Sequence, residues 1–126
     1  MKKRIIISLV NALHIVGTVR LGGDFAPRDP EFYLESVKHI ITEAGLTIVG
    51  SPTLHRFDET AFTLAVLLAE SHVSMHTWYE LGLVHLDVFT CGMTKDNSDA
   101  ARQVFNRIAS LFDPIMIEGR REIVRH

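Results

Sequence analysis

The chain has 126 residues, of which 47% are hydrophobic and 22% charged, and its formal net charge is -2. This length and composition suit one globular domain, residues 1–126, with a core of its own, and are short for two domains. Lys and Arg are scattered among Asp and Glu, so the sequence lacks the basic stripe that neutralises nucleic-acid phosphates. We therefore expect no nucleic-acid partner.

The single cysteine, Cys91, has no second cysteine for an internal disulfide, which favours a reducing compartment. The opening MKKRIIISLVNALHIVG has the basic start and apolar run of a signal peptide. However, Ser8, Asn11 and His14 interrupt that run, and no small-residue cleavage site follows. No apolar run approaches the roughly 20 residues needed to cross a bilayer. We expect a soluble, cytoplasmic protein that does not bind a membrane.

The first elements predicted in chain order are strands, followed by a loop. β-branched residues over 5–10 predict a strand that resumes over 14–21, and the glycines and proline of 22–27 predict a loop. Further strands are predicted over residues 46–57, 62–70, 72–78, 83–90 and, briefly, 115–118. The strands over 72–78 and 83–90 are joined by a turn at Gly82.

Two helices complete the pattern. Asp29 and Pro30 are typical of a helix start, because the carboxylate caps free amides and proline needs no amide at the first position. Apolar residues at helical spacing predict helices over 30–44 and about 98–112, the second ended by Pro114. Grouped strands with few helices favour the α+β class, as a two-layer sandwich of an antiparallel sheet with two helices on one face.

Alternate side chains of a strand share a face, so one face of each strand around Gly82 is polar and aromatic. The residues on these faces are His72, Ser74, His76 and Trp78 on the first strand, and His85, Asp87, Phe89 and Cys91 on the second. Antiparallel pairing across the turn would bring Cys91 close to Ser71 and His72. The pattern thus predicts that a serine, histidines and a cysteine converge at one end of the sheet.

The pattern alone leaves several interpretations open. Histidines and serines are common on a solvated sheet face, and a lone cysteine is usually a small buried hydrophobe. A metal site built from His72, His76 and His85 is disfavoured, because two same-face histidines four residues apart in a strand lie about 13 Å apart. A Ser-His nucleophilic site remains open, although Ser71 does not sit in a Gly-x-Ser-x-Gly elbow.

Five short motifs occur in order between residues 46 and 92. They are the histidine and phenylalanine of His55-Arg56-Phe57, the junction Glu70-Ser71-His72, the run His76-Thr77-Trp78, then Glu80, and the block DVFTCG at 87–92. In order and spacing these motifs resemble the prokaryotic S-adenosylmethionine decarboxylase family. The resemblance covers the central third of the chain strongly, the second helix weakly and the first 45 residues hardly at all.

This resemblance implies that the chain cuts itself between Glu70 and Ser71. In the family, the serine hydroxyl attacks the preceding carbonyl, the acyl group moves from nitrogen to oxygen, and β-elimination leaves a dehydroalanine that hydrolyses to a pyruvoyl group. The expected products are a β chain, 1–70, and an α chain, 71–126, that begins with the pyruvoyl derived from Ser71. This covalent cofactor forms a Schiff base with the substrate amine and accepts electrons as carbon dioxide leaves, so neither pyridoxal phosphate nor a metal is expected.

The same resemblance assigns roles in processing and catalysis. His76 is expected to remove the serine α-proton during processing, and Thr63 stands where the family has a serine that helps this step. Cys91 is the expected proton donor to the decarboxylated carbon.

Substrate binding is expected at Phe57, Trp78 and Glu80. The family phenylalanine that matches Phe57 packs on the substrate, since an aromatic face suits an adenine ring and a sulfonium charge. The matching glutamate, Glu80, binds the ribose hydroxyls. Taken singly, Phe57 also suits a core position and Glu80 a solvated turn. The resemblance further implies a homodimer with pockets near the subunit interface.

The sequence departs from the family at two places. After the His-x-Phe motif the family has Pro-x-Gly-Val-Ser-Gly, whereas residues 58–64 read DETAFTL here, and Tyr79 replaces the proline before Glu80. Carboxylates at Asp58 and Glu59 would attract a second ammonium or a guanidinium, although two adjacent carboxylates also make a good surface turn.

The function expected first is therefore S-adenosylmethionine decarboxylation in polyamine and spermidine biosynthesis, and two alternatives stay open. One is an ornithine or arginine decarboxylase on the same scaffold. The other is a non-catalytic relative that acts as a binding or regulatory subunit. The presence of Ser71, His76 and Cys91 together favours the enzyme.

Overall fold

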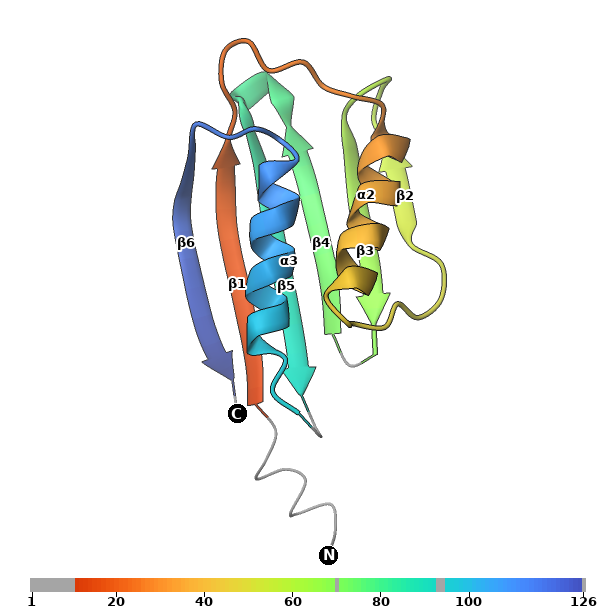
Figure 1. Ribbon diagram of the computed structural model, residues 1–126. Helices are drawn as coiled ribbons and strands as arrows, with labels where there is room; N and C mark the ends of the chain where they lie inside the picture. The colour runs from red at the N-terminus through yellow and green to blue at the C-terminus, as the bar shows by residue number, and fades with distance from the viewer. Residues whose placement is uncertain (1–10, 70, 93–94, 126) are drawn as a thin grey trace, which may run out of the picture.

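The computed structural model describes residues 11–69, 71–92 and 95–125 (Figure 1). The strands are β1 (Asn11–Arg20), β2 (Thr53–Arg56), β3 (Phe62–Leu68), β4 (Ser71–Trp78), β5 (Leu83–Gly92) and β6 (Met116–Arg125). The helices are α2 (Pro30–Glu43) and α3 (Ser98–Ser110), and a short 3₁₀ turn, η1 (Tyr79–Leu81), joins β4 to β5. The strand predicted over 5–10 and the cleavage residue Glu70 lie outside the described residues.

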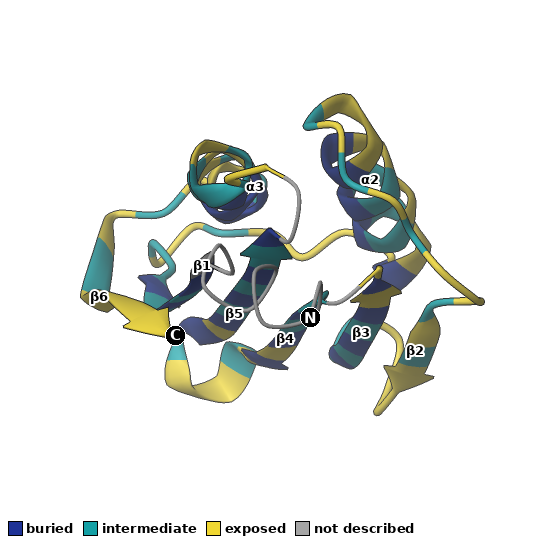
Figure 2. Ribbon diagram, turned by 90° about the horizontal axis from the view of Figure 1, so that it is seen from below, coloured by how far each residue is buried: buried dark blue, intermediate teal, exposed yellow. Residues whose placement is uncertain are grey.

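The strands form one antiparallel sheet in the order β2-β3-β4-β5-β1-β6. Strand β1 lies in the interior of this sheet, between β5 and β6, although it comes first in the chain. Both helices cover the same face of the sheet, and the dark buried residues lie between the two layers (Figure 2). The predicted α+β sandwich is thus confirmed.

The helices begin where the sequence predicts and pack through the apolar stripes it predicts. The Asp29 side chain accepts a 2.8 Å hydrogen bond from the backbone N–H of Glu31, and Pro30 is the first residue of α2. Tyr33 on α2 stacks on Phe112, just beyond α3, with ring centroids 4.7 Å apart. Both rings are fully buried, so they join the two helices to each other above the sheet.

The strand predicted over 46–57 is broken, and the last strand is longer than predicted. Ile48 makes an isolated bridge to Leu68, and β2 begins only at Thr53, because Gly50 turns the chain with a φ of 68°. Strand β6 runs to Arg125 through a largely exposed sequence whose pairing with β1 supplies the hydrogen bonds.

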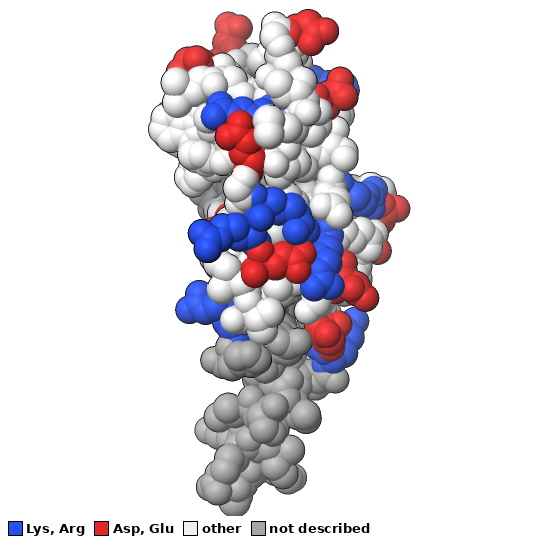
Figure 3. Space-filling model, turned by 90° about the vertical axis from the view of Figure 1, so that its left-hand side faces the viewer, with Lys and Arg blue, Asp and Glu red and all other residues white. Residues whose placement is uncertain are grey.

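Strand β6 is an edge strand, and ion pairs with its carboxylates cover its side of the molecule (Figure 3). Arg20 of β1 donates to Glu118 at 2.7 Å, and Arg102 of α3 donates to Glu122 at 3.0 Å. Arg120 lies 3.0 Å from the same Glu122. Charges along an exposed edge oppose pairing with a further strand there.

No helix or strand of the described residues covers the sheet surface opposite the helices, and we call this surface the open face. On β4, Val73, Met75 and Thr77 are buried toward the helices, which places the alternate residues on the open face. Its residues on the three central strands are His14, Val16, Thr18, His72, Ser74, His76, Trp78, His85, Asp87, Phe89 and Cys91. Within the described part of the chain, neither helix is long and apolar enough to cross a membrane.

Candidate active site

Ser71 and Cys91 lie at the same end of the sheet, as the sequence predicts. Ser71 is the first residue of β4, pairs with Leu68 of β3 and is half-buried. His72 pairs with Phe89 of β5, and Cys91 follows two residues later on the same face of that strand. The register therefore places the half-buried Cys91 beside the start of β4, at the lower end of the sheet in Figure 1.

His76 lies toward the opposite end of β4 with Thr63 as its partner. These residues pair across β3 and β4, and the Thr63 Oγ1 lies 3.0 Å from the His76 Nδ1, a hydrogen bond. Five residues of extended strand separate Ser71 from His76, a distance of about 17 Å. The expectation that serine, histidines and cysteine converge at one sheet end holds for Ser71, His72 and Cys91 but is wrong for His76.

The expected substrate-binding residues gather at the His76 end. Phe57 follows β2, is 63% exposed and touches His55 edge-to-face at 4.8 Å, so it is not a core residue. Trp78 ends β4, is 42% exposed and lies edge-to-face on His85. Glu80 is exposed on η1, in the turn that follows Trp78. One end of the sheet thus carries the cleavage serine, and the other end carries aromatic and carboxylate groups.

Asp58 shapes the turn after Phe57. Its Oδ1 accepts hydrogen bonds from the backbone N–H groups of Ala61 at 2.7 Å and Thr60 at 2.8 Å. These two N–H groups hold the pKa of Asp58 below its usual value. The carboxylate therefore accepts its hydrogen bonds within the turn, which favours the interpretation of Asp58 as a surface-turn residue over a site that binds a guanidinium group.

Tyr79 takes up the position of the family proline with an aromatic ring. The ring packs near Phe25, with centroids 5.7 Å apart, against the core. Burial, and then the nearby Tyr33, raises the pKa of Tyr79. Its hydroxyl is buried and has no hydrogen-bond partner among the described residues. Apolar packing of the Tyr79 ring and the 3.0 Å hydrogen bond from the Gly82 N–H to the Tyr79 carbonyl thus hold the turn that contains Glu80.

Strand β1 brings a histidine to the open face that the sequence did not single out. His14 lies opposite Phe89 on β5, and its Nε2 donates a 2.7 Å hydrogen bond to the Oδ1 of Asp87. The His72 Nε2, from β4, lies 3.4 Å from the same oxygen. The alternation of side chains along residues 11–20 is enough to place His14 on the face of the strand that points away from the core. Only the long-range pairing of β1 with β5 places it beside Asp87.

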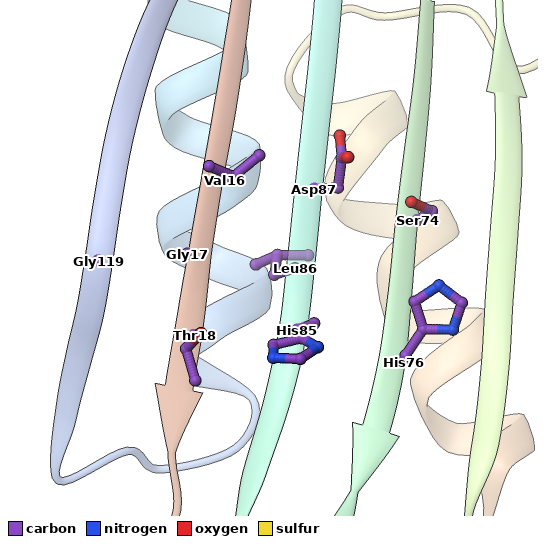
Figure 4. Close-up of a pocket in the computed structure, with 9 residues that line it drawn as sticks. All are labelled: Val16, Gly17, Thr18, Ser74, His76, His85, Leu86, Asp87 and Gly119. Atoms are coloured by element: carbon purple, nitrogen blue, oxygen red, sulfur yellow. The ribbon is translucent and has the colours of Figure 1, made fainter.

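These three side chains offer ligand atoms within 4.8 Å of one another, the arrangement that a metal site requires. However, ligand atoms that zinc holds at 2.0–2.1 Å in a tetrahedron lie about 3.3 Å from one another. The His14 Nε2 and the Asp87 Oδ1 are only 2.7 Å apart, which is a hydrogen-bond distance. The geometry is that of a hydrogen-bonded pair, His14 and Asp87, with His72 at ion-pair distance. Asp87 also lines a hollow of about 360 Å³ together with Ser74, His76 and His85 on the open face (Figure 4).

The family model described as S-adenosylmethionine decarboxylase matches residues 26–118. The S-adenosylmethionine decarboxylase proenzyme of Thermodesulfovibrio yellowstonii is 37% identical over 97 residues, which are 74% of this chain and 70% of that protein. The proenzyme of Archaeoglobus fulgidus is 53% identical over 58 residues, 46% of this chain and 51% of that protein. The aligned part thus spans about half the length of the Archaeoglobus relative.

A solved structure is similar over nearly the whole chain. The crystal structure of the adenosylmethionine decarboxylase from Aquifex aeolicus superposes with a TM-score of 0.69 at 28% identity, covering 90% of this chain and 88% of that one. The match of sequence over residues 26–118 and the match of fold agree with the motif spacing around Ser71. The chain therefore belongs to the S-adenosylmethionine decarboxylase family.

Proposed function

We propose that this chain is a self-processing, pyruvoyl-dependent S-adenosylmethionine decarboxylase of polyamine biosynthesis. The observation that carries the proposal is the position of Ser71, a half-buried serine that opens β4 beside Cys91. The relatives are named proenzymes, which supports cleavage of the precursor. In this proposal the Glu70–Ser71 bond is cut to give chains 1–70 and 71–126.

The residues at this end fit the pyruvoyl group, because its precursor is Ser71 itself and the strand start is held by pairing with Leu68. The Ser71 hydroxyl attacks the carbonyl of the preceding residue, and the peptide nitrogen becomes the leaving group. His76 then takes the α-proton of Ser71 as the Cβ–O bond of the ester breaks and residue 70 leaves as a carboxylate. Water hydrolyses the resulting dehydroalanine to the pyruvoyl group, and its nitrogen leaves as ammonia. Once formed, the pyruvoyl group supplies the electron sink for loss of carbon dioxide. The Cys91 thiol returns a proton to the substrate carbon.

These roles require two copies of the chain. Ser71 and His76 lie about 17 Å apart along β4, so the imidazole of one chain cannot reach its own serine. Two open faces packed against each other about a twofold axis would place the His76 end of one copy over the Ser71 end of the other. Leu67 and Trp78, 61% and 42% exposed, would be covered by this packing. We propose this homodimer, with each site shared between the Ser71 end of one copy and the His76 end of the other.

Complementation tests the shared site. The Ser71→Ala variant and the His76→Ala variant should each stay uncut alone, because each lacks one half of both sites. When the two variants are co-expressed, each mixed dimer holds one complete site, formed by Ser71 of its His76→Ala chain and His76 of its Ser71→Ala chain, so the His76→Ala chain of every mixed dimer should be cut. Absence of any cleaved chain in isolated mixed dimers would contradict the shared site.

The geometry favours S-adenosylmethionine over ornithine or arginine. Exposed aromatic rings at Phe57 and Trp78 suit an adenine and a sulfonium, whereas the Asp58 carboxylate is bound within its own turn. Release of labelled carbon dioxide from the three carboxyl-labelled substrates tests this. We expect turnover of S-adenosylmethionine only, and none by Ser71→Ala. Preferred turnover of ornithine or arginine would contradict the substrate assignment.

A reducing, cytoplasmic location is proposed together with this function. Cys91 acts as a proton donor only while it remains a thiol. The chain contains no second cysteine that would protect it in an internal disulfide.

A further inference from the structure

Three strands contribute to the cluster around Asp87. The carboxylate, on β5, hydrogen bonds to His14 of β1 at 2.7 Å and lies 3.4 Å from the Nε2 of His72 on β4. Because a carboxylate oxygen only accepts, its hydrogen bond to His14 requires a proton on that Nε2. Phe89 contacts both imidazoles, with ring centroids 5.5 Å from His14 and 5.6 Å from His72, and the imidazole centroids are 6.2 Å apart. The two rings are therefore fixed by a shared charge and a shared aromatic neighbour.

His72 is the residue that follows the proposed cleavage serine. Before cleavage, the chain runs directly from β3 into β4, since Leu68 pairs with Ser71. Cleavage between residues 70 and 71 removes that covalent connection and leaves Ser71 as the first residue of a new chain. The start of β4 is then held by backbone pairing with β3 and β5 and by the contact of His72 with Asp87.

The pyruvoyl group of the proposed enzyme would be joined through its amide carbonyl to the backbone nitrogen of His72, and its reactive ketone would be the next carbon. Ends of strands fray unless they are tied down, and catalysis requires the reacting atoms to be held closely. A displacement of about 1 Å can cost up to 100-fold in rate. An anchor on the side chain of His72 acts one peptide unit from the reacting group.

We infer that Asp87 is a positioning residue that anchors His72, braced by His14, and so holds the start of the cleaved α chain in place for decarboxylation. This inference rests on the proposed function, because the anchor becomes necessary only after the chain is cut. Asp87 does not touch the substrate in this role. It acts through His72.

Hydrogen exchange on cut and uncut protein tests the inference. Asp87→Ala is made in the self-cleaving chain and in the uncut Ser71→Ala background, and exchange is measured for amides at the start of β4. In the cut protein we expect exchange about 5- to 10-fold faster than in the cut wild type, as expected for the net loss of one ordinary hydrogen bond. In the uncut background the change should stay below about 2-fold.

Turnover provides the second measurement. In the cut enzyme Asp87→Ala should lower kcat by about 10- to 100-fold while KM changes by less than about 3-fold, because the reacting group and not the substrate is misplaced. Asp87→Asn, which keeps the volume, should change both measurements in the same direction but less. Asp99→Ala is the matched control, since this carboxylate lies exposed on α3 and pairs with Arg102. It should change neither.

The outcomes separate the two proposals. Equal effects of Asp87→Ala on exchange in cut and uncut protein would overturn the anchor and show a general structural role. Failure of both Asp87 variants to be cut would also overturn it, by placing Asp87 in the cleavage reaction. A wild-type chain that is never cut would overturn the proposed function, and the anchor with it. A cut, active wild type whose kcat is unchanged in Asp87→Ala would overturn the anchor alone.

Discussion

The hydrogen bond between Thr63 and His76 gives a sharp test of the processing role. Thr63→Val removes the Oγ1 that lies 3.0 Å from the His76 Nδ1, and it keeps the β-branched shape that suits strand β3. The hydrogen bond is on the exposed side of the sheet, so the free energy of unfolding should change by less than about 0.5 kcal/mol. The change therefore affects the orientation of the imidazole and leaves the fold intact.

The expected loss follows from the value of one hydrogen bond. An imidazole that is no longer oriented should lose about 1 to 2 kcal/mol of stabilisation of the processing transition state. At 25 °C this corresponds to self-cleavage that is about 5- to 30-fold slower. Thr63→Ser keeps the hydroxyl and should cleave within about 3-fold of the wild-type rate.

Cleavage is followed by cell-free synthesis, quenching in denaturant and intact mass at successive times. Thr53→Val, at an exposed threonine of β2, is the matched control and should cleave at the wild-type rate. Wild-type kinetics in Thr63→Val would refute the argument that this hydroxyl orients His76. A drop in the unfolding free energy of more than about 1 kcal/mol would show that Thr63 acts on the fold instead.

Three further predictions follow from single contacts. Tyr79→Phe should raise the free energy of unfolding in urea by about 1 kcal/mol, because it removes a buried hydroxyl without a partner among the described residues; a loss of stability would show that the hydroxyl is satisfied. Arg102 holds the pKa of Glu122 below its usual value, so the ion pair contributes stability that is present above about pH 4.3 and is lost as the pH falls through the lowered pKa. Glu122→Gln should therefore make the free energy of unfolding fall less steeply with decreasing pH in this range. An unchanged dependence on pH would contradict this contribution. Phe57→Ala should raise KM for S-adenosylmethionine about 10-fold without changing the unfolding midpoint, because the ring is 63% exposed; an unchanged KM would remove Phe57 from the binding site.

The local pattern was enough to predict β4, β5 and the faces they present. Period-two alternation and the turn at Gly82, where φ is 70°, fix both the register and the face of Cys91. The rise per residue of a strand, which sets the distance from His72 to His76, also sets the distance from Ser71 to His76, so the second distance could be predicted from the sequence. Spacing alone therefore indicates that Ser71 and His76 of one chain cannot meet.

The contacts of β1 and β6 could not be predicted from local sequence patterns. The pairing of His14 with Phe89 joins residues 75 positions apart, and no periodicity specifies which strands become neighbours. Strand β6 is exposed along most of its length, so it lacks the apolar alternation that marks a strand. Its hydrogen bonds to β1, and not its side chains, define it. The cluster around Asp87 therefore became visible only with the sheet order.

The intact mass of the purified protein under denaturing conditions, for the wild type and for Ser71→Ala, tests self-cleavage at Ser71 most directly. We expect two chains in the wild type, corresponding to residues 1–70 and 71–126, with the second blocked at its amino end by a carbonyl that reacts with hydrazine. We expect one full-length chain in Ser71→Ala. A single unmodified chain in both proteins would contradict self-processing at Ser71 and would favour a non-catalytic member of the family.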